Sequence, residues 1–93
     1  MAPPLSDVTH IPDADRFELS VNGHMAYLEY IQTRVNFVIS HTEVPKEAEG
    51  NGAGSTLVEA ALAYAQEADL PVIPICPFAR AYIENRTRKA SEA

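Results

Sequence analysis

The sequence is poor in the features that mark several large classes of protein. It has a single cysteine, Cys76, which excludes an intramolecular disulfide and a multi-cysteine metal site and fits a reducing compartment. It has only 7 Lys and Arg against 13 Asp and Glu, for a net charge of −6, so the clustered positive charge that a nucleic-acid backbone requires is missing. No stretch approaches the ~18 apolar residues of a membrane span, and the N-terminus lacks the basic start and apolar core of a signal peptide. These absences predict a cytoplasmic protein that binds neither nucleic acid nor membrane.

What the chain does have is the composition of one ordinary globular domain. Its 93 residues are 46% hydrophobic and 22% charged, which is enough for a modest core and too short for two domains. We expect a flexible N-terminus at residues 1–7, a single domain at 8–89 and a flexible tail at 90–93.

The first half of the domain predicts an antiparallel meander. Apolar and polar residues alternate over 16–21, which is the period of a strand with one buried face. The Asn22-Gly23 pair that follows is the strongest short signal of a hairpin, because both central residues of a type I′ turn have positive φ. A second strand is expected at about 24–32 and a third at about 35–43.

The second half changes to helical periodicity. The apolar residues of about 55–68 fall on one stripe of a helix. The apolar run at 72–75 predicts an edge strand, because Pro74 cannot donate a ladder hydrogen bond, and residues 77 to about 89 predict a second helix. The third and fourth strands are then parallel neighbours joined by a β-α-β crossover. We therefore expect an α+β fold, in which a mixed sheet begins as an antiparallel meander and continues with the crossover and a C-terminal helix.

The chain has only four glycines, and three of them are Gly50, Gly52 and Gly54. They fall between the third strand and the first helix, where successive N–H groups and the helix N-terminus favour an anion. A tight connection with Ser55 as the helix N-cap explains the same residues without a ligand. A nucleoside triphosphate loop would need a lysine after its last glycine, and a dinucleotide loop would need another glycine spacing and an acidic residue after the next strand. Neither pattern is present, since Ser55 follows Gly54 and the next strand ends in Cys76.

The glycine loop resembles the pyrophosphate loop of the GNAT acetyltransferase superfamily. That loop has a Gln or Arg followed by x-x-G-x-G or x-x-G-x-A, and residues 49–54 read EGNGAG, with Glu49 in place of the usual Gln or Arg. The resemblance covers about residues 15–86 and implies a minimal GNAT-like N-acetyltransferase domain. It is most specific to a small stand-alone subfamily, through the segments SHTEVP (40–45), STLVEAALAYA (55–65) and PICPFARAYIE (74–84), which surround the loop in this order.

The resemblance implies that acetyl-CoA binds between the third and fourth strands as the acyl donor, without a metal. The pantetheine arm would lie along the backbone of Thr42, Glu43 and Val44. Glu49 sets a carboxylate beside a polyanion, so weak CoA affinity is expected. The pyrophosphate would be held by the loop, whose cofactor-binding residues are Glu49, Gly50, Asn51, Gly52, Ala53, Gly54 and Ser55.

Two side chains are candidates for catalysis. Cys76 precedes Pro77, and at the N-cap of the last helix its thiolate would be stabilised by the helix dipole; a small buried apolar residue is the alternative. His41 ends the third strand and could act as a general base; a solvated histidine is the alternative. In the resembling subfamily the cysteine lies near the acetyl thioester. Because the two strands are neighbours, we expect His41 and Cys76 to approach across the gap.

Three other side chains are expected outside the chemistry. A tyrosine on the last helix protonates CoA in larger GNAT enzymes, but Tyr82 shares a helical stripe with Phe78, so packing is the favoured role. His10 and His24 are expected at the surface.

Two functions stay open. The first is an acetyl-CoA-dependent N-acetyltransferase of unknown acceptor, acting either by direct attack of an amine or through an acyl intermediate on Cys76. The second is a non-catalytic module that binds CoA or another protein. Larger GNAT enzymes carry N-terminal helices that form one wall of the acceptor site. This chain leaves no length for them, so a homodimer partner or a large protein acceptor would supply that wall.

Overall fold

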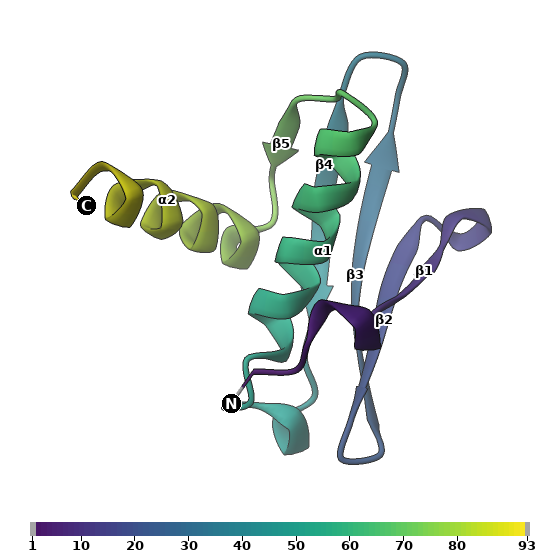
Figure 1. Ribbon diagram of the computed structural model, residues 1–93. Helices are drawn as coiled ribbons and strands as arrows, with labels where there is room; N and C mark the ends of the chain where they lie inside the picture. Colours follow the sequence, from purple (N-terminus) through teal and green to yellow (C-terminus); the bar gives the residue numbers. More distant parts are fainter. Residues whose placement is uncertain (1, 93) are drawn as a thin grey trace.

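The structure, a computed structural model, describes residues 2–92 and the side chains of residues 2–88. Five strands form one sheet in the order β1-β2-β3-β4-β5 (Figure 1). Neighbouring strands are antiparallel from β1 to β4, and β5 runs parallel to β4 at the edge. The predicted α+β architecture is confirmed. The elements are η1 (Leu5–Asp7), β1 (Thr9–Ile11), η2 (Pro12–Ala14), β2 (Arg16–Val21), β3 (His24–Gln32), β4 (Phe37–Glu43), η3 (Lys46–Ala48), α1 (Ala53–Glu67), β5 (Val72–Pro74) and α2 (Pro77–Glu92).

The β2–β3 hairpin forms where the sequence predicts it. Asn22 and Gly23 have φ of 53° and 79°, the positive values that a type I′ turn requires. Val21 pairs with His24 directly across the turn. The two strands therefore have a fixed register, which places Leu19 opposite Ala26 on the buried face.

Several boundaries differ from the prediction. The strand β1 was not expected, because three residues before Pro12 carry too little pattern to be recognised; it adds an antiparallel edge to β2. The β4 strand begins at Phe37 rather than near 35, because the Thr33 hydroxyl accepts the N–H groups of Val35 and Asn36 at 3.2 and 2.9 Å and closes a turn there. The predicted strand 72–75 ends one residue early, at Pro74.

The start of α1 also differs. The helix begins at Ala53, and Gly52 is its N-cap, with φ of 76°. Ser55, the predicted N-cap, is instead the third residue of the helix. At the other end of the chain, α2 is described as far as Glu92, so of the tail predicted at 90–93 residue 93 lies outside the described residues.

The core lies between α1 and one face of the sheet (Figure 1). The first turn of α2 completes it through Ala79, while residues 84–88 are exposed as the helix projects away from the sheet (Figure 1). The fully buried large side chains come from β2, β3, β4 and α1, namely Phe37, Leu19, Leu28, Ile39, Leu57 and Val58.

His10 belongs to this packing, and its predicted place at the surface is wrong. Its ring stacks on Phe17 with centroids 4.2 Å apart, and its Nε2 lies 2.6 Å from the Tyr30 hydroxyl. β1 brings it there by pairing His10 with Phe17. Burial lowers the pKa of the His10 imidazole below its ordinary value. His24, in contrast, is exposed as expected.

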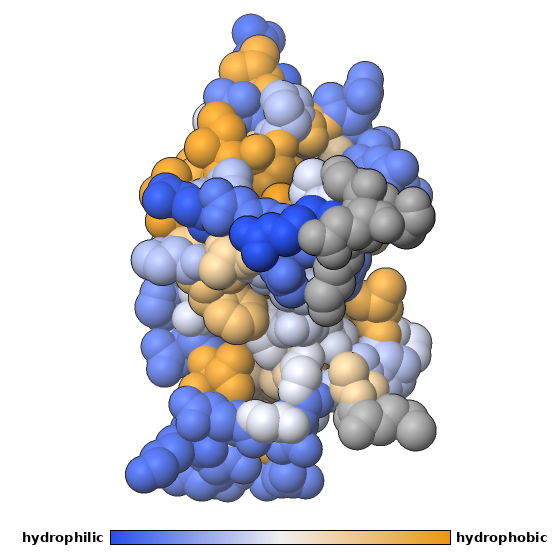
Figure 2. Space-filling model, turned by 90° about the vertical axis from the view of Figure 1, so that its left-hand side faces the viewer, coloured by the Kyte–Doolittle hydropathy of each residue, from blue (hydrophilic) through white to orange (hydrophobic). Residues whose placement is uncertain are grey.

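Apolar side chains also remain at the surface. Seen from the side of α2, they gather in the upper part of the molecule, where β5 and the β3–β4 connection lie, and hydrophilic residues cover the lower end (Figure 2). The most exposed ones in these two segments are Val35, Ile73 and Ile75. The last of them directly precedes Cys76.

Candidate functional site

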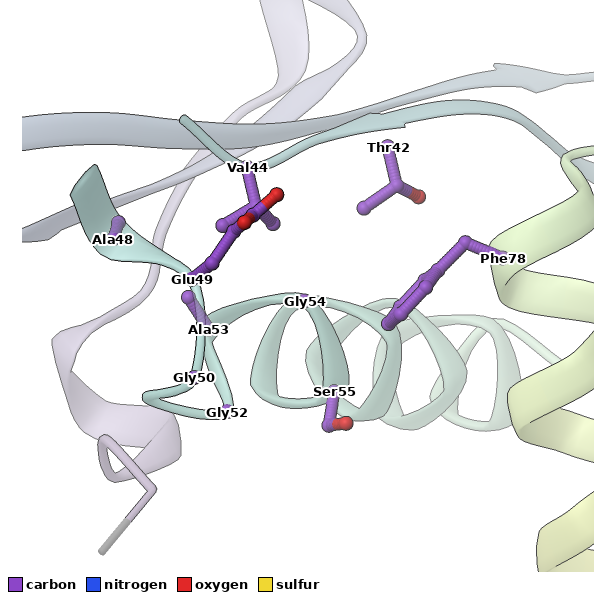
Figure 3. A pocket seen from close by; sticks show the side chains of 10 residues that line it. All are labelled: Thr42, Val44, Ala48, Glu49, Gly50, Gly52, Ala53, Gly54, Ser55 and Phe78. Carbon is purple, nitrogen blue, oxygen red and sulfur yellow. The ribbon is translucent and has the colours of Figure 1, made fainter. Parts of the chain in front are cut away.

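The sheet splits between β4 and β5, and this split forms the site. The two strands pair only from Phe37 to Ile39. The Ile39 carbonyl then accepts the N–H groups of both Ile75 and Cys76, each at 3.1 Å. Beyond that point β4 continues to Glu43, while the segment that follows β5 turns away into α2. A cleft opens between them, with the N-terminus of α1 opposite β4 (Figure 3).

The cleft holds a pocket of about 300 Å³. Apolar groups dominate the end nearest β4 and α2, and backbone groups of the glycine loop form the other end (Figure 3). Ten residues from β4, η3, the loop, α1 and α2 line it: Thr42, Val44, Ala48, Glu49, Gly50, Gly52, Ala53, Gly54, Ser55 and Phe78.

The glycine loop has the conformation of an anion cradle. Gly50 and Gly52 have φ of 85° and 76°, which only glycine adopts without strain. The N–H groups of Ala53, Gly54 and Ser55 begin α1 and have no acceptor within the helix. Gly54 lets the Phe78 ring pack directly on the start of α1, because a Cβ there would lie 2.7 Å from the ring. The loop therefore presents unpaired donors and the positive end of a helix to the pocket.

One side chain opposes this use of the loop. The Glu49 side chain points from the loop toward Val44 and lines the pocket (Figure 3). None of the described residues that line the pocket is basic. Backbone dipoles alone would hold an anion here, and the carboxylate would weaken its binding.

Two residues of the predicted cofactor set point elsewhere. Asn51 turns back and donates from its side-chain amide to the Ala48 carbonyl at 3.2 Å, which shapes the loop. Glu43 lies on the opposite face of the sheet and bonds His41, with Nε2 and Oε1 3.1 Å apart. The remaining predicted residues line the pocket.

A β-bulge decides which side chains of β4 face the cleft. His41 pairs with Glu29 but Ile39 pairs with Tyr30, so Ser40 is an extra residue in β4, and its hydroxyl donates to the Glu29 carbonyl at 3.1 Å. Because of this extra residue, the side chains after Ser40 point to the face opposite the one that strict alternation from Ile39 would give. His41 therefore lies on the exposed face, and the structure does not bring it together with Cys76.

Thr42 takes the place expected for His41. It pairs with the buried Leu28, so it points to the α1 side of the sheet. Its Oγ1 lies 3.6 Å from the Sγ of Cys76. The sequence carries a signal for this arrangement, because His41 and Glu43 share the parity of Ile39, and an unbroken strand would bury both polar side chains.

Cys76 occupies the N-cap of α2, as predicted. Its carbonyl accepts the N–H of Arg80 at 2.9 Å, the first bond of the helix, and its side chain is 5% exposed. Burial raises the pKa of the thiol, but hydrogen bonds from the Ala79 and Phe78 N–H groups and from Thr42 outweigh it, and the pKa falls below its ordinary value. A lowered pKa at a helix N-terminus is typical of a reactive cysteine.

Tyr82 faces away from this pocket. Its hydroxyl donates to the Glu59 carboxylate at 2.5 Å, and Arg86 contacts the same oxygen at 2.8 Å. Burial, followed by the bond to Glu59, raises the pKa of Tyr82 to about 12. The side chain is half-buried against the core, so its contacts are those of a packing residue.

Two further observations concern the described part of the chain. It contains no group of three or more His, Cys, Asp or Glu side chains placed to hold a metal ion. Neither of its α-helices has the length and apolar character needed to cross a bilayer.

Backbone donors at the end of a split parallel strand pair are typical of sites that hold a phosphate group through the main chain. Over residues 16–91 the chain matches the family model of the GCN5-related N-acetyl-transferases, and it belongs to that family. Members generally take acetyl-CoA as the acyl donor. No curated protein sequence matches the chain.

Proposed function

We propose that this protein transfers an acyl group from acetyl-CoA to an amine. The observation that carries the proposal is the glycine loop, whose unpaired N–H groups at Ala53, Gly54 and Ser55 suit a diphosphate. The pocket continues from the loop to Thr42 on β4, which gives an extended ligand a route toward Cys76. Family membership supports acyl transfer as the general chemistry.

Two routes are compatible with the site. In the covalent route, the Cys76 thiolate attacks the thioester carbonyl, a bond forms from Sγ to the acyl carbon, and the bond from that carbon to the CoA sulfur breaks, so that CoA leaves as a thiolate. An amine then attacks the acyl-cysteine, Cys76 is released as a thiolate, and the amine proton passes to solvent. In the direct route the amine attacks the donor thioester itself, Thr42 only lines the pocket, and Cys76 takes no part in the reaction.

The lowered pKa of Cys76 favours the covalent route, because the thiolate is the nucleophile. His41 stays a predicted base without a contact to Cys76, since its partner is Glu43. On the exposed face of the sheet it could meet only an acceptor that approaches from that side.

A CoA titration followed by NMR tests the donor site. The amide signals of Gly50, Gly52 and Gly54 should shift, while Gly23, in the β2–β3 hairpin, serves as a control within the same spectrum because the chain has no other glycine. Unmoved loop signals at millimolar CoA would remove the proposal.

Mass spectrometry distinguishes the two routes. Incubation with acetyl-CoA should add one acetyl group at Cys76 in the covalent route and leave the chain unmodified in the direct one. Cys76→Ser would abolish amine-dependent CoA release in the first case and spare it in the second.

A non-catalytic CoA-binding module is the second candidate, and the burial of Cys76 favours it. Such a module would bind CoA at the loop without releasing CoA faster in the presence of amines. CoA release measured with and without a panel of amines therefore separates the candidates.

A further inference from the structure

Phe78 forms the wall of the pocket on the side of α2. Its side chain leaves the second residue of α2 and reaches across to Gly54 on α1, below Thr42 (Figure 3). A Cβ at Gly54 would lie 2.7 Å from the ring Cζ and 2.9 Å from Cε2. The ring therefore rests in a space that exists only because residue 54 is glycine.

Cys76 precedes Phe78 by two residues. It does not line the pocket, and only 5% of its surface is exposed. Thr42 is the residue that connects the two spaces, because it lines the pocket and its hydroxyl also contacts the Cys76 sulfur. A group inside the pocket can therefore contact the same threonine as the sulfur, although the pocket itself does not reach Cys76.

The Phe78 ring is not part of the buried core. Phe78 is 44% exposed, which is unusual for a large apolar side chain. The helix start does not depend on it, since the buried Ala79 and the Cys76 carbonyl bonded to Arg80 hold this turn in place. Rotation about χ1 alone would carry the ring away from Gly54.

We propose that Phe78 is a gate between the donor pocket and Cys76. With the ring on Gly54, the pocket ends at the ring and the sulfur is shielded. With the ring rotated outward, the pocket extends to Sγ. The identity of the ligand in the pocket rests on the proposed function, but the gate itself concerns only access to the sulfur.

Alkylation of the native chain measures that access directly. Iodoacetamide reacts with the thiolate, which forms a thioether and displaces iodide, and Cys76 is the only cysteine, so intact mass reports this site alone. The alkylation rate should be measured over a pH series. Such a series separates an effect on the pKa of the thiol from an effect on access to the sulfur. Phe78→Ala should raise the pH-independent rate roughly tenfold or more, because thiol reactivity follows exposure.

Ile75→Ala is the matched control. Ile75 is an exposed apolar residue beside Cys76 that does not line the pocket, so its removal should leave the rate unchanged. An unchanged rate in Phe78→Ala overturns the gate. Equal acceleration in both variants overturns it as well, because it would report general loosening of the start of α2.

The CoA titration distinguishes a failure of the gate from a failure of the proposed function. If the loop glycines respond to CoA and Phe78→Ala leaves alkylation unchanged, the donor site stands and the gate is wrong. If Phe78→Ala accelerates alkylation and CoA moves no loop signal, the gate stands and the proposed function is wrong.

Discussion

The Oγ1 atom of Thr42 lies 3.6 Å from the Sγ atom of Cys76 and connects β4 with the start of α2, beyond the point where β4 and β5 pair. Thr42 belongs to the half of β4 that continues past the split, and Cys76 caps the helix that follows β5. This contact links the glycine-loop pocket to the one thiol of the protein. It also supplies a side-chain donor to a group whose other donors are backbone N–H groups.

Replacing Thr42 with valine should raise the pKa of Cys76. The substitution keeps the shape of the side chain and removes the hydroxyl that donates to the thiolate. The midpoint of the pH profile of alkylation should move upward in Thr42→Val and return toward the wild-type value in Thr42→Ser. An identical midpoint in all three proteins would mean that the backbone donors alone set the pKa.

Replacing Glu49 with glutamine should tighten CoA binding. Removing one carboxylate beside a diphosphate relieves a repulsion on the order of 1 kcal/mol, or roughly fivefold in Kd. The difference in CoA Kd between the wild type and Glu49→Gln should become smaller as salt is added, because ions screen exposed charges. Glu47→Gln, an exposed carboxylate of η3 outside the pocket, is the control, and an equal gain there would point to net charge rather than position.

Gly54 and Phe78 should be coupled in stability. Alanine in a helix is favoured over glycine by about 0.5–1 kcal/mol, but at residue 54 its Cβ meets the Phe78 ring. Gly54→Ala should therefore stabilise the chain only when Phe78 is also alanine. Urea unfolding of the four proteins gives the coupling energy, expected near ~1 kcal/mol, and additive effects would show that the ring yields at no cost.

Tyr82→Phe should lower stability and leave chemistry intact. It removes the hydroxyl bonded to Glu59, for a loss of about 1 kcal/mol. Tyr64→Phe, which removes a hydroxyl bonded to Gln32, is the control for loss of a similar bond far from the pocket. A large fall in acyl transfer with unchanged CoA affinity, seen in Tyr82→Phe alone, would identify Tyr82 as a proton donor instead.

His10 should make the fold sensitive to mild acid. Burial lowers its pKa, so the folded state favours the neutral ring and the unfolded state takes up the proton first. Its stabilising contribution is complete above about pH 6.5, the ordinary value, and is lost as the pH falls through that value toward the lower folded pKa. Unfolding in urea at several pH values should show this loss, and His10→Phe should flatten it. The same slope in both proteins would assign the effect to other groups.

The sequence predicted the elements that depend on local pattern. The Asn22-Gly23 turn, the helical stripes of α1 and α2 and the N-cap position of Cys76 follow from residues that are neighbours in the chain. The glycine loop was predicted for the same reason. The features that were missed depend on contacts between residues that are not neighbours in the chain: β1 pairs with β2, which sets His10 on Phe17, and the place of Phe78 depends on the absence of a Cβ at Gly54.

The most instructive difference between prediction and structure is that Thr42, and not His41, lies beside Cys76 at the cleft. Strict alternation from Phe37 and Ile39 carries His41 to the buried face; the polar character of His41 and Glu43 argues against it, but no local feature identifies Ser40 as the extra residue. What selects the bulge is the whole pairing of β4 with β3, which puts Thr42 beside Leu28 and leaves Glu43 in solvent. The periodicity of β4 alone therefore does not predict the bulge, because the bulge depends on how β4 pairs with β3.

The bulge at Ser40 makes the chemistry of the cleft depend on how β4 pairs with β3 as well as on the identity of its residues. If Ser40 paired regularly with Glu29, the rest of the strand would turn over, so that an imidazole and a carboxylate would face the sulfur in place of a hydroxyl and an isopropyl group. Loss of Ser40, in contrast, would remove the bulge and keep Thr42 in the cleft, because His41 would then follow Ile39 directly in the alternation. The two arrangements of β4 differ by one residue of register, so strand pairing sets which functional group stands beside the only thiol.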